Sequence, residues 1–151
     1  MIDGILVVVD TNVWISALIN LWGPPARLMQ AVLSGRIRLV LSSPMIAEIQ
    51  GVVHRNRIRR RITLNDQELD AYFSAMSRGS VLADVSGGLR VCRDPKDDLI
   101  VETAIAGGAR YLVSRDEDLT RDLDLVNALR EHGVDVLTVA RFLELLDAQQ
   151  H

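Results

Sequence analysis

The chain has 151 residues, 48% hydrophobic and 25% charged, a composition typical of one globular domain spanning residues 1–151. Its longest apolar run, Ile5 to Val9, is far shorter than the roughly 20 residues of a membrane span, and Asp3 stands where a signal peptide carries positive charge. The single cysteine, Cys92, excludes an internal disulfide and a multi-cysteine metal site. The sequence carries no P-loop and no dinucleotide-binding motif. We expect a cytoplasmic protein that does not bind a membrane.

The formal net charge is −3, yet sixteen of the seventeen basic residues are arginines. Arginine is the residue best suited to bind phosphate groups. If several of the acidic residues were gathered in one metal pocket, the remaining surface would be basic. The negative net charge therefore does not exclude a nucleic-acid substrate.

Short apolar segments alternate with helical patterns along most of the chain. Strands are expected at 5–9, 38–41, 81–82, 89–92, 111–113 and 134–137. Helices are expected from 12 onward, at about 26–33, from 42 or 43 towards 54, from 65 or 66 to about 76, from 94–95 to about 107, at about 123–131 and from 138 to about 146. This alternation predicts a three-layer α/β/α sandwich with a mainly parallel central sheet, whose functional crevice lies at the carboxyl ends of the strands.

Two aspartates follow predicted strands. Asp10 directly follows the most hydrophobic strand, and Asp116 comes three residues after the strand at 111–113. Both positions face the expected crevice. The structural alternative is helix capping, because Asp is a favourable N-cap residue.

Two further carboxylates interrupt helix faces that should be buried. Glu48 shares a helical stripe with Met45 and Ile49, and Asp97 shares one with Ile100 and Val101. The structural alternative for Asp97 is a capping-box-like role at the start of its helix.

Buried carboxylates repel one another and lose hydration, and a divalent cation with oxygen ligands offsets both costs. We therefore predict that Asp10, Glu48, Asp97 and Asp116 bind Mg²⁺ or Mn²⁺, with Asp98 as a possible additional ligand. Such an ion supports phosphodiester hydrolysis. The three histidines lack the spacing of zinc ligands.

Four segments carry a resemblance to a known family: Val-Val-Asp10-Thr11-Asn12, Pro-Met-Ile-Ala-Glu48, Asp94-Pro-Lys-Asp97-Asp98 and Ser114-Arg115-Asp116-Glu-Asp118. In this order they resemble the PIN-domain family, and within it the VapC-like toxin nucleases of prokaryotic toxin–antitoxin pairs. The resemblance covers almost the whole chain.

The resemblance implies a metal-dependent ribonuclease that acts on single-stranded or structured RNA. It assigns the catalytic and metal-binding acids to Asp10, Glu48, Asp97 and Asp116. Polar support would come from Thr11, Asn12 and Ser114. The resemblance also implies a homodimer and a cognate antitoxin protein that blocks the acidic groove.

Basic residues cluster after the helix that carries Glu48. We expect this cluster to bind the RNA backbone, although a solvated helix end is an equally simple explanation. Its arginines are Arg55, Arg57, Arg59, Arg60 and Arg61.

Two other functions fit parts of the pattern. Asp10 could act as the nucleophile of a phosphatase or the acceptor of a receiver domain, but Asn12 stands where such phosphatases need a second aspartate, and Lys96 is the only lysine. The chain could also bind RNA or a protein partner without cleaving it. The intact set of acids favours the nuclease.

Overall fold

The computed structural model describes residues 4–90, 92, 95–115 and 117–149. Its five strands form one sheet in the order β3-β2-β1-β4-β5, and every neighbouring pair is parallel. The strands are β1 (Ile5–Val9), β2 (Ile37–Leu41), β3 (Val81–Leu82), β4 (Tyr111–Val113) and β5 (Asp135–Leu137). The predicted parallel sheet is confirmed.

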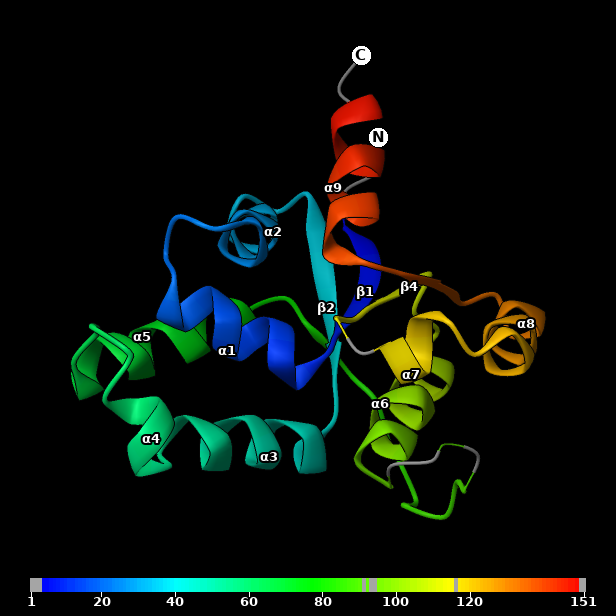
Figure 1. The fold of residues 1–151 in the computed structure, drawn as a ribbon, viewed down its shortest axis with the longest axis horizontal. Coiled ribbons are helices and arrows are strands. Elements are labelled where there is room, and N and C mark those ends of the chain that lie inside the picture. Colours follow the sequence, from blue (N-terminus) through cyan, green and yellow to red (C-terminus); the bar gives the residue numbers. More distant parts are fainter. Residues whose placement is uncertain (1–3, 91, 93–94, 116, 150–151) are drawn as a thin grey trace.

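Helices cover both faces of this sheet. In Figure 1, α1, α2 and α5 lie on one side of the strands, and α6 and α8 lie on the other. Helix α9 packs beside α2. The helices are α1 (Thr11–Ile19), α2 (Pro24–Leu33), α3 (Ser43–Val53), α4 (Asn56–Arg59), α5 (Asp66–Ser77), α6 (Pro95–Ala106), α7 (Glu117–Thr120), α8 (Leu123–Glu131) and α9 (Val139–Ala148). The predicted α/β/α sandwich is therefore confirmed.

The central strands are buried because β1 and β4 lie inside the sheet and are covered on both faces. Val7, Val8 and Val9 are fully buried, as are Leu112 and Val113. This burial explains why both strands are continuous apolar runs without polar alternation. The chain leaves β1 towards β2 and returns from β3 to β4, so the strand order reverses between β1 and β4. Parallel α/β sheets bind ligands at the carboxyl ends of the strands beside such a reversal.

Two local expectations are wrong. The sequence pattern predicts a strand at 89–92, but Leu89, Arg90 and Cys92 lie outside the sheet. In this region the backbone amides of Gly87 and Cys92 donate to carboxylates of α6, and not to a neighbouring strand. The second concerns the short helices α4 and α7, which are not among the predicted elements because four residues are too few to show a helical period. None of the helices in the described part of the chain combines the length and apolar character that a bilayer crossing requires.

Helix α6 ends at two glycines with different roles. Gly108 adopts a φ of 68°, a left-handed conformation that favours glycine and stops the helix. Gly107 lies so close to β2 that an added Cβ would clash with the side chain of Val40, which is fully buried. The carboxyl end of α6 therefore rests directly on the sheet.

We expect Gly107→Ala to lower the free energy of unfolding by about 1–3 kcal/mol, because the new methyl group overpacks the contact with Val40. Gly51→Ala is the matched control, since Gly51 lies within α3 and a Cβ added there would meet no atom within 4 Å. That control should be neutral or raise stability by up to about 1 kcal/mol. Urea unfolding of both variants measures the difference, and equal stabilities would contradict the close contact.

Candidate active site at the carboxyl end of the sheet

Asp10 and Ser114 meet at the carboxyl ends of β1 and β4. Val9 of β1 pairs in register with Val113 of β4, so the next residue of each strand lies side by side. The Asp10 amide donates to the Val113 carbonyl at 2.9 Å, and the Ser114 hydroxyl donates to Asp10 Oδ2 at 2.7 Å. Asp10 is only 3% exposed and Ser114 is fully buried. The parallel register thus holds a buried carboxylate in one orientation.

Capping does not account for Asp10. It stands at the N-cap position of α1, but its side chain makes no capping hydrogen bond to the described residues of that helix. The positive end of the α1 dipole still stabilises a negative charge at this place. The Asp10 carboxylate therefore lies at the start of α1, but it accepts its hydrogen bond from the Ser114 hydroxyl after β4.

Thr11 supplies an unsatisfied polar atom beside Asp10. Its side chain is 5% exposed, and Thr11 Oγ1 has no hydrogen-bond partner among the described residues. A buried hydroxyl without a partner costs about 1–3 kcal/mol. A bound polar group, such as a hydrated cation or a phosphate, would satisfy this hydroxyl of the residue that follows Asp10. Asn12, the next residue, is exposed.

Asp97 and Asp98 occupy the first turn of α6, at the same edge of the sheet, because α6 runs antiparallel to the strands it connects. Both are buried, at 5% and 4% exposure. Asp98 Oδ1 accepts a hydrogen bond of 2.7 Å from the backbone amide of Cys92. Asp98 is thus buried, and its carboxylate holds the backbone at Cys92, shortly before α6.

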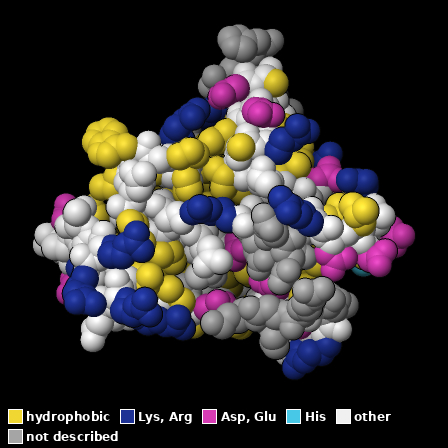
Figure 2. Space-filling view, viewed as in Figure 1, with side chains coloured by type: hydrophobic (Ala, Val, Ile, Leu, Met, Phe, Trp, Pro, Cys, Tyr) yellow, Lys and Arg dark blue, Asp and Glu magenta, His cyan; other side chains and the backbone are white. Residues whose placement is uncertain are grey.

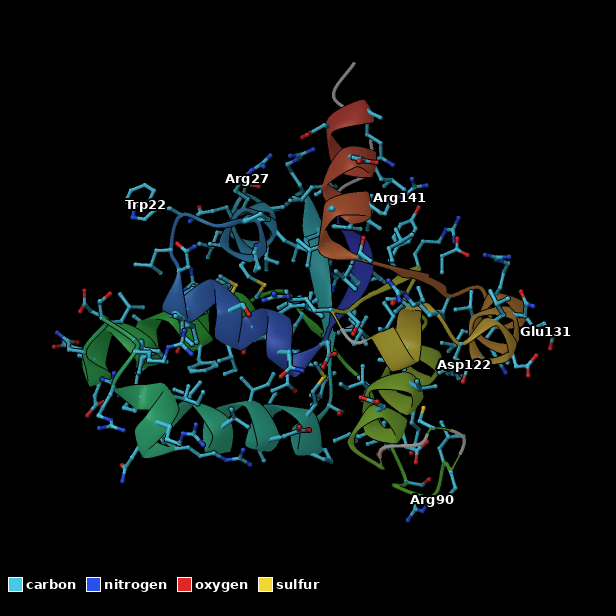
Figure 3. All side chains as sticks on the ribbon, in the orientation of Figure 1. Trp22, Arg27, Arg90, Asp122, Glu131 and Arg141 are labelled. Atoms are coloured by element: carbon cyan, nitrogen blue, oxygen red, sulfur yellow. The ribbon has the colours of Figure 1, made fainter. Side chains whose placement is uncertain are left out.

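The electrostatic environment at the start of α6 is negative. Burial contributes most to the pKa of the Cys92 thiol, and together with the hydrogen bond and charge of Asp98 and the charges of Asp97 and Asp122 it raises that pKa to about 12. Of these causes, only the charges of the carboxylates also favour a bound cation, because burial disfavours charge of either sign. Asp122 caps α8 through the Leu125 amide at 3.1 Å, between α7 and α8 in Figure 3.

Glu48 lies on α3 between buried Met45 and Ile49, as its sequence pattern predicts, and is half-buried. Helix α3 packs against both α1 and α6. Asp116 lies outside the described residues, as does Asp94. No three of the described His, Cys, Asp and Glu side chains are grouped closely enough to hold one ion among themselves.

The five arginines after α3 differ in their surroundings. They follow α3, as expected, and occupy α4 and its flanks. Arg59 donates to Asp66 Oδ1 at 3.0 Å, and Arg60 donates to the Asn56 carbonyl at 3.2 Å. Arg55, Arg57 and Arg61 are exposed. Two of the five thus stabilise local structure.

Two polar residues near the site have roles that sequence reasoning missed. Ser42 stands at the predicted N-cap of α3, but its side chain makes no capping hydrogen bond to the described residues of that helix. Its hydroxyl lies 2.8 Å from that of Thr103 on α6, and both residues are fully buried. The position of Ser42, directly after a buried strand like Asp10 and Ser114, was the available signal. This contact ties α6 to the end of β2.

Glu102 holds the loop that leads into α6. Its carboxylate accepts from the Ser86 amide at 2.7 Å, the Ser86 hydroxyl at 3.1 Å and the Gly87 amide at 3.2 Å. Partial desolvation raises the pKa of Glu102, but these hydrogen bonds together lower it more, so the net pKa lies below its usual value of 4.5. The charged form of Glu102 is therefore the form that fixes the loop.

Comparisons with known proteins identify the family of this chain. A family model described as the PIN domain matches residues 6–118, and the chain belongs to the PIN domain family. The uncharacterized protein MJ1680 of Methanocaldococcus jannaschii is 29% identical over 142 residues, which span 93% of this chain and 90% of that protein.

A solved structure shares the fold. A chain in the crystal structure of VapBC2 from Rickettsia felis, bound to a DNA fragment from their promoter, has a TM-score of 0.52 and 18% identity. The match covers 88% of this chain and 98% of that chain. At this identity the similarity is evidence for the fold alone.

We expect Glu102→Gln to destabilise the protein at pH 7, because a neutral amide accepts fewer and weaker hydrogen bonds from the loop. A carboxylate whose pKa is lowered by folding contributes stability above its unfolded pKa, near 4.5, and loses it as pH falls through the lower folded value. The difference in thermal midpoint between the native protein and Glu102→Gln should therefore shrink below about pH 4.

Glu131→Gln is the control, because Glu131 is exposed on α8, far from this loop (Figure 3). It should leave the midpoint nearly unchanged at pH 7. A Glu102→Gln difference that stays constant from pH 7 to pH 3 would show that the loop does not depend on the charge.

Proposed function

We propose that this protein is a metal-dependent ribonuclease of the VapC-like type and the toxin of a toxin–antitoxin pair. The observation that supports this most directly is the burial of the Asp10 and Asp97 carboxylates at one edge of the sheet, in a chain of the PIN domain family. Proteins of this family are nucleases in general. Buried carboxylates at such an edge need a cationic partner or ligand.

The residues at this edge suit Mg²⁺ or Mn²⁺. Carboxylate oxygens are the ligands these hard cations prefer, and Mg²⁺ is commonly held by only one or two carboxylates together with waters and substrate phosphates. Asp10 and Asp97 would provide these ligands. The family resemblance assigns Glu48 and Asp116 as further ligands, but no three of the described acids are grouped closely enough to hold one ion among themselves. The unsatisfied Thr11 hydroxyl is consistent with a further polar group at this place. Asp98 is the weaker candidate, because it already accepts from Cys92.

When bound, the divalent cation would make water acidic enough to attack a phosphodiester at neutral pH and would neutralise charge on the phosphate oxygens. The chain's own residues orient this site. Ser114 fixes the Asp10 carboxylate through its hydrogen bond, and the contact between Ser42 and Thr103 fixes the helix that carries Asp97. This pre-organisation lowers the cost of aligning the ligands when RNA binds.

Partners follow from the same proposal. The VapBC2 structure contains a complex and a promoter DNA fragment, which supports a cognate antitoxin as a partner of this chain as well. We propose a homodimer in the cytoplasm, with single-stranded or structured RNA as the substrate.

We expect Asp10→Asn to lower the rate of RNA cleavage by at least about 100-fold, since it removes a negative charge at nearly constant volume. Asp97→Asn should have a similar effect, and Asp98→Asn a smaller one. Cleavage of labelled single-stranded RNA in Mg²⁺ or Mn²⁺, with an EDTA control, measures the rates. Circular dichroism confirms that each variant is folded.

A second readout separates catalysis from mere binding. Asp10→Asn should weaken Mn²⁺ binding measured by calorimetry, whereas Asp124→Asn, a change in the first turn of α8, should not. Full activity of Asp10→Asn would exclude the proposed mechanism. RNA binding without cleavage in either metal would favour the non-catalytic alternative.

A further inference from the structure

A cleft opens directly beside the candidate site. It has a volume of about 720 Å³ and lies between the end of α1, the start of α2, the segment after β4 and the start of α9. Ser114 is part of its wall. Because Ser114 donates to Asp10 Oδ2, one residue of the cleft wall contacts the buried carboxylate directly.

The cleft is basic. Arg115 and Arg61 both line it, and none of the described lining residues is acidic. They come from different segments, one after β4 and one between α4 and α5. Arg115 Nη1 donates to the Ser16 hydroxyl at 2.7 Å, which holds its guanidinium against the wall formed by α1. Two guanidiniums on a cleft whose described wall carries no carboxylate complement successive phosphates of a strand.

The remaining wall is both apolar and polar. Ile19, Pro24 and Pro25 supply aliphatic surface, while Asn20 and Thr138 supply hydrogen-bonding groups. Figure 2 shows this apolar area over the starts of α2 and α9, with basic side chains beside it. An unstacked nucleobase needs such a combination, since its face packs on apolar groups and its edge forms hydrogen bonds.

Arg61 connects the cleft to the basic residues around α4. It also lines a second hollow of about 600 Å³, together with Arg55, Arg57 and Ile58. Three exposed arginines therefore continue the basic surface away from the carboxylates. Arg59 and Arg60 line neither hollow.

We propose that single-stranded RNA runs from the carboxylates through this cleft, with one nucleotide in the hollow and its neighbouring phosphates on Arg115 and Arg61. The proposal rests on the ribonuclease function above and adds the path of the substrate. An acidic peptide would match the charge of the cleft, but it would not account for the direct link to the carboxylates. An RNA substrate must contact the carboxylates to be cleaved, and the same strand can continue into the adjoining cleft.

Binding without cleavage tests the path. Fluorescence anisotropy of a labelled single-stranded RNA in EDTA gives the affinity of the native protein and of Arg115→Ala and Arg61→Ala. Each variant should weaken binding about tenfold, as expected for one charge-assisted contact. Each should also reduce the slope of log K against log salt by about 0.7, the value for one phosphate of a single strand.

Arg130→Ala is the matched control. Arg130 is an exposed arginine on α8 beside Glu131, which Figure 3 places far from the cleft, and its partner Asp135 keeps a second ion pair with Arg110 at 2.8 Å. The control should bind RNA like the native protein. Equal weakening by all three substitutions would indicate a general charge effect and would overturn the proposed path.

A change of shape without a change of charge tests the nucleotide pocket. Ala140→Trp places a large side chain in the cleft and should weaken RNA binding, whereas Ala148→Trp, at the other end of α9, should not. Thermal unfolding shows whether both variants are folded.

The outcomes separate this inference from the proposed function. Native protein that cleaves RNA while the arginine and Ala140 variants bind RNA normally would overturn the path and leave the nuclease intact. Loss of poly-L-glutamate binding with unchanged RNA binding in Arg115→Ala would assign the cleft to an acidic protein partner, again against the proposal. Folded native protein that neither binds nor cleaves RNA would overturn both.

Discussion

The parallel register between β1 and β4 is the constraint on which the site depends. It pairs Val9 with Val113 and so places Asp10 beside Ser114, where neither side chain is exposed to bulk water. Burial of a carboxylate is costly unless hydrogen bonds or a cation offset it. The Ser114 hydroxyl and the dipole of α1 provide part of this compensation. A shift of the register by one residue would separate Asp10 from Ser114 and direct their side chains to opposite faces of the sheet.

Helix α6 connects this strand pair to the second group of acids. Its carboxyl end rests on Val40 through Gly107, and Thr103 contacts Ser42 at the end of β2. Helix α6 therefore contacts β2 and the residue that follows it at two points along its length, Thr103 and Gly107. These two contacts fix the position of Asp97 in its first turn. Asp98 and Glu102 have a structural role on the same helix, because both carboxylates accept hydrogen bonds from the segment before it.

The arginines also differ in what they contact. Arg59, Arg60 and Arg90 donate to nearby carbonyls or carboxylates and stabilise local turns. Arg61 and Arg115 line the cleft beside the carboxylates. A chain with a negative net charge thus presents a basic surface where an RNA strand would approach its acidic site. This separation of charge would attract a polyanion towards the acidic site.

The sequence by itself determined the longer elements and the residue types at their ends, because burial on both faces and helical periodicity act over a few residues. Continuous apolar runs marked β1 and β4, a mostly apolar run marked β2, and helical stripes marked α3 and α6 together with their carboxylates. Tertiary structure alone decided which residues meet. The partnership of Asp10 with Ser114, the contact of Ser42 with α6 and the hydrogen bond from Cys92 to α6, where the sequence predicts a strand, join separate segments. Local patterns cannot specify such contacts, because they arise from strand register and helix docking between elements far apart in the chain.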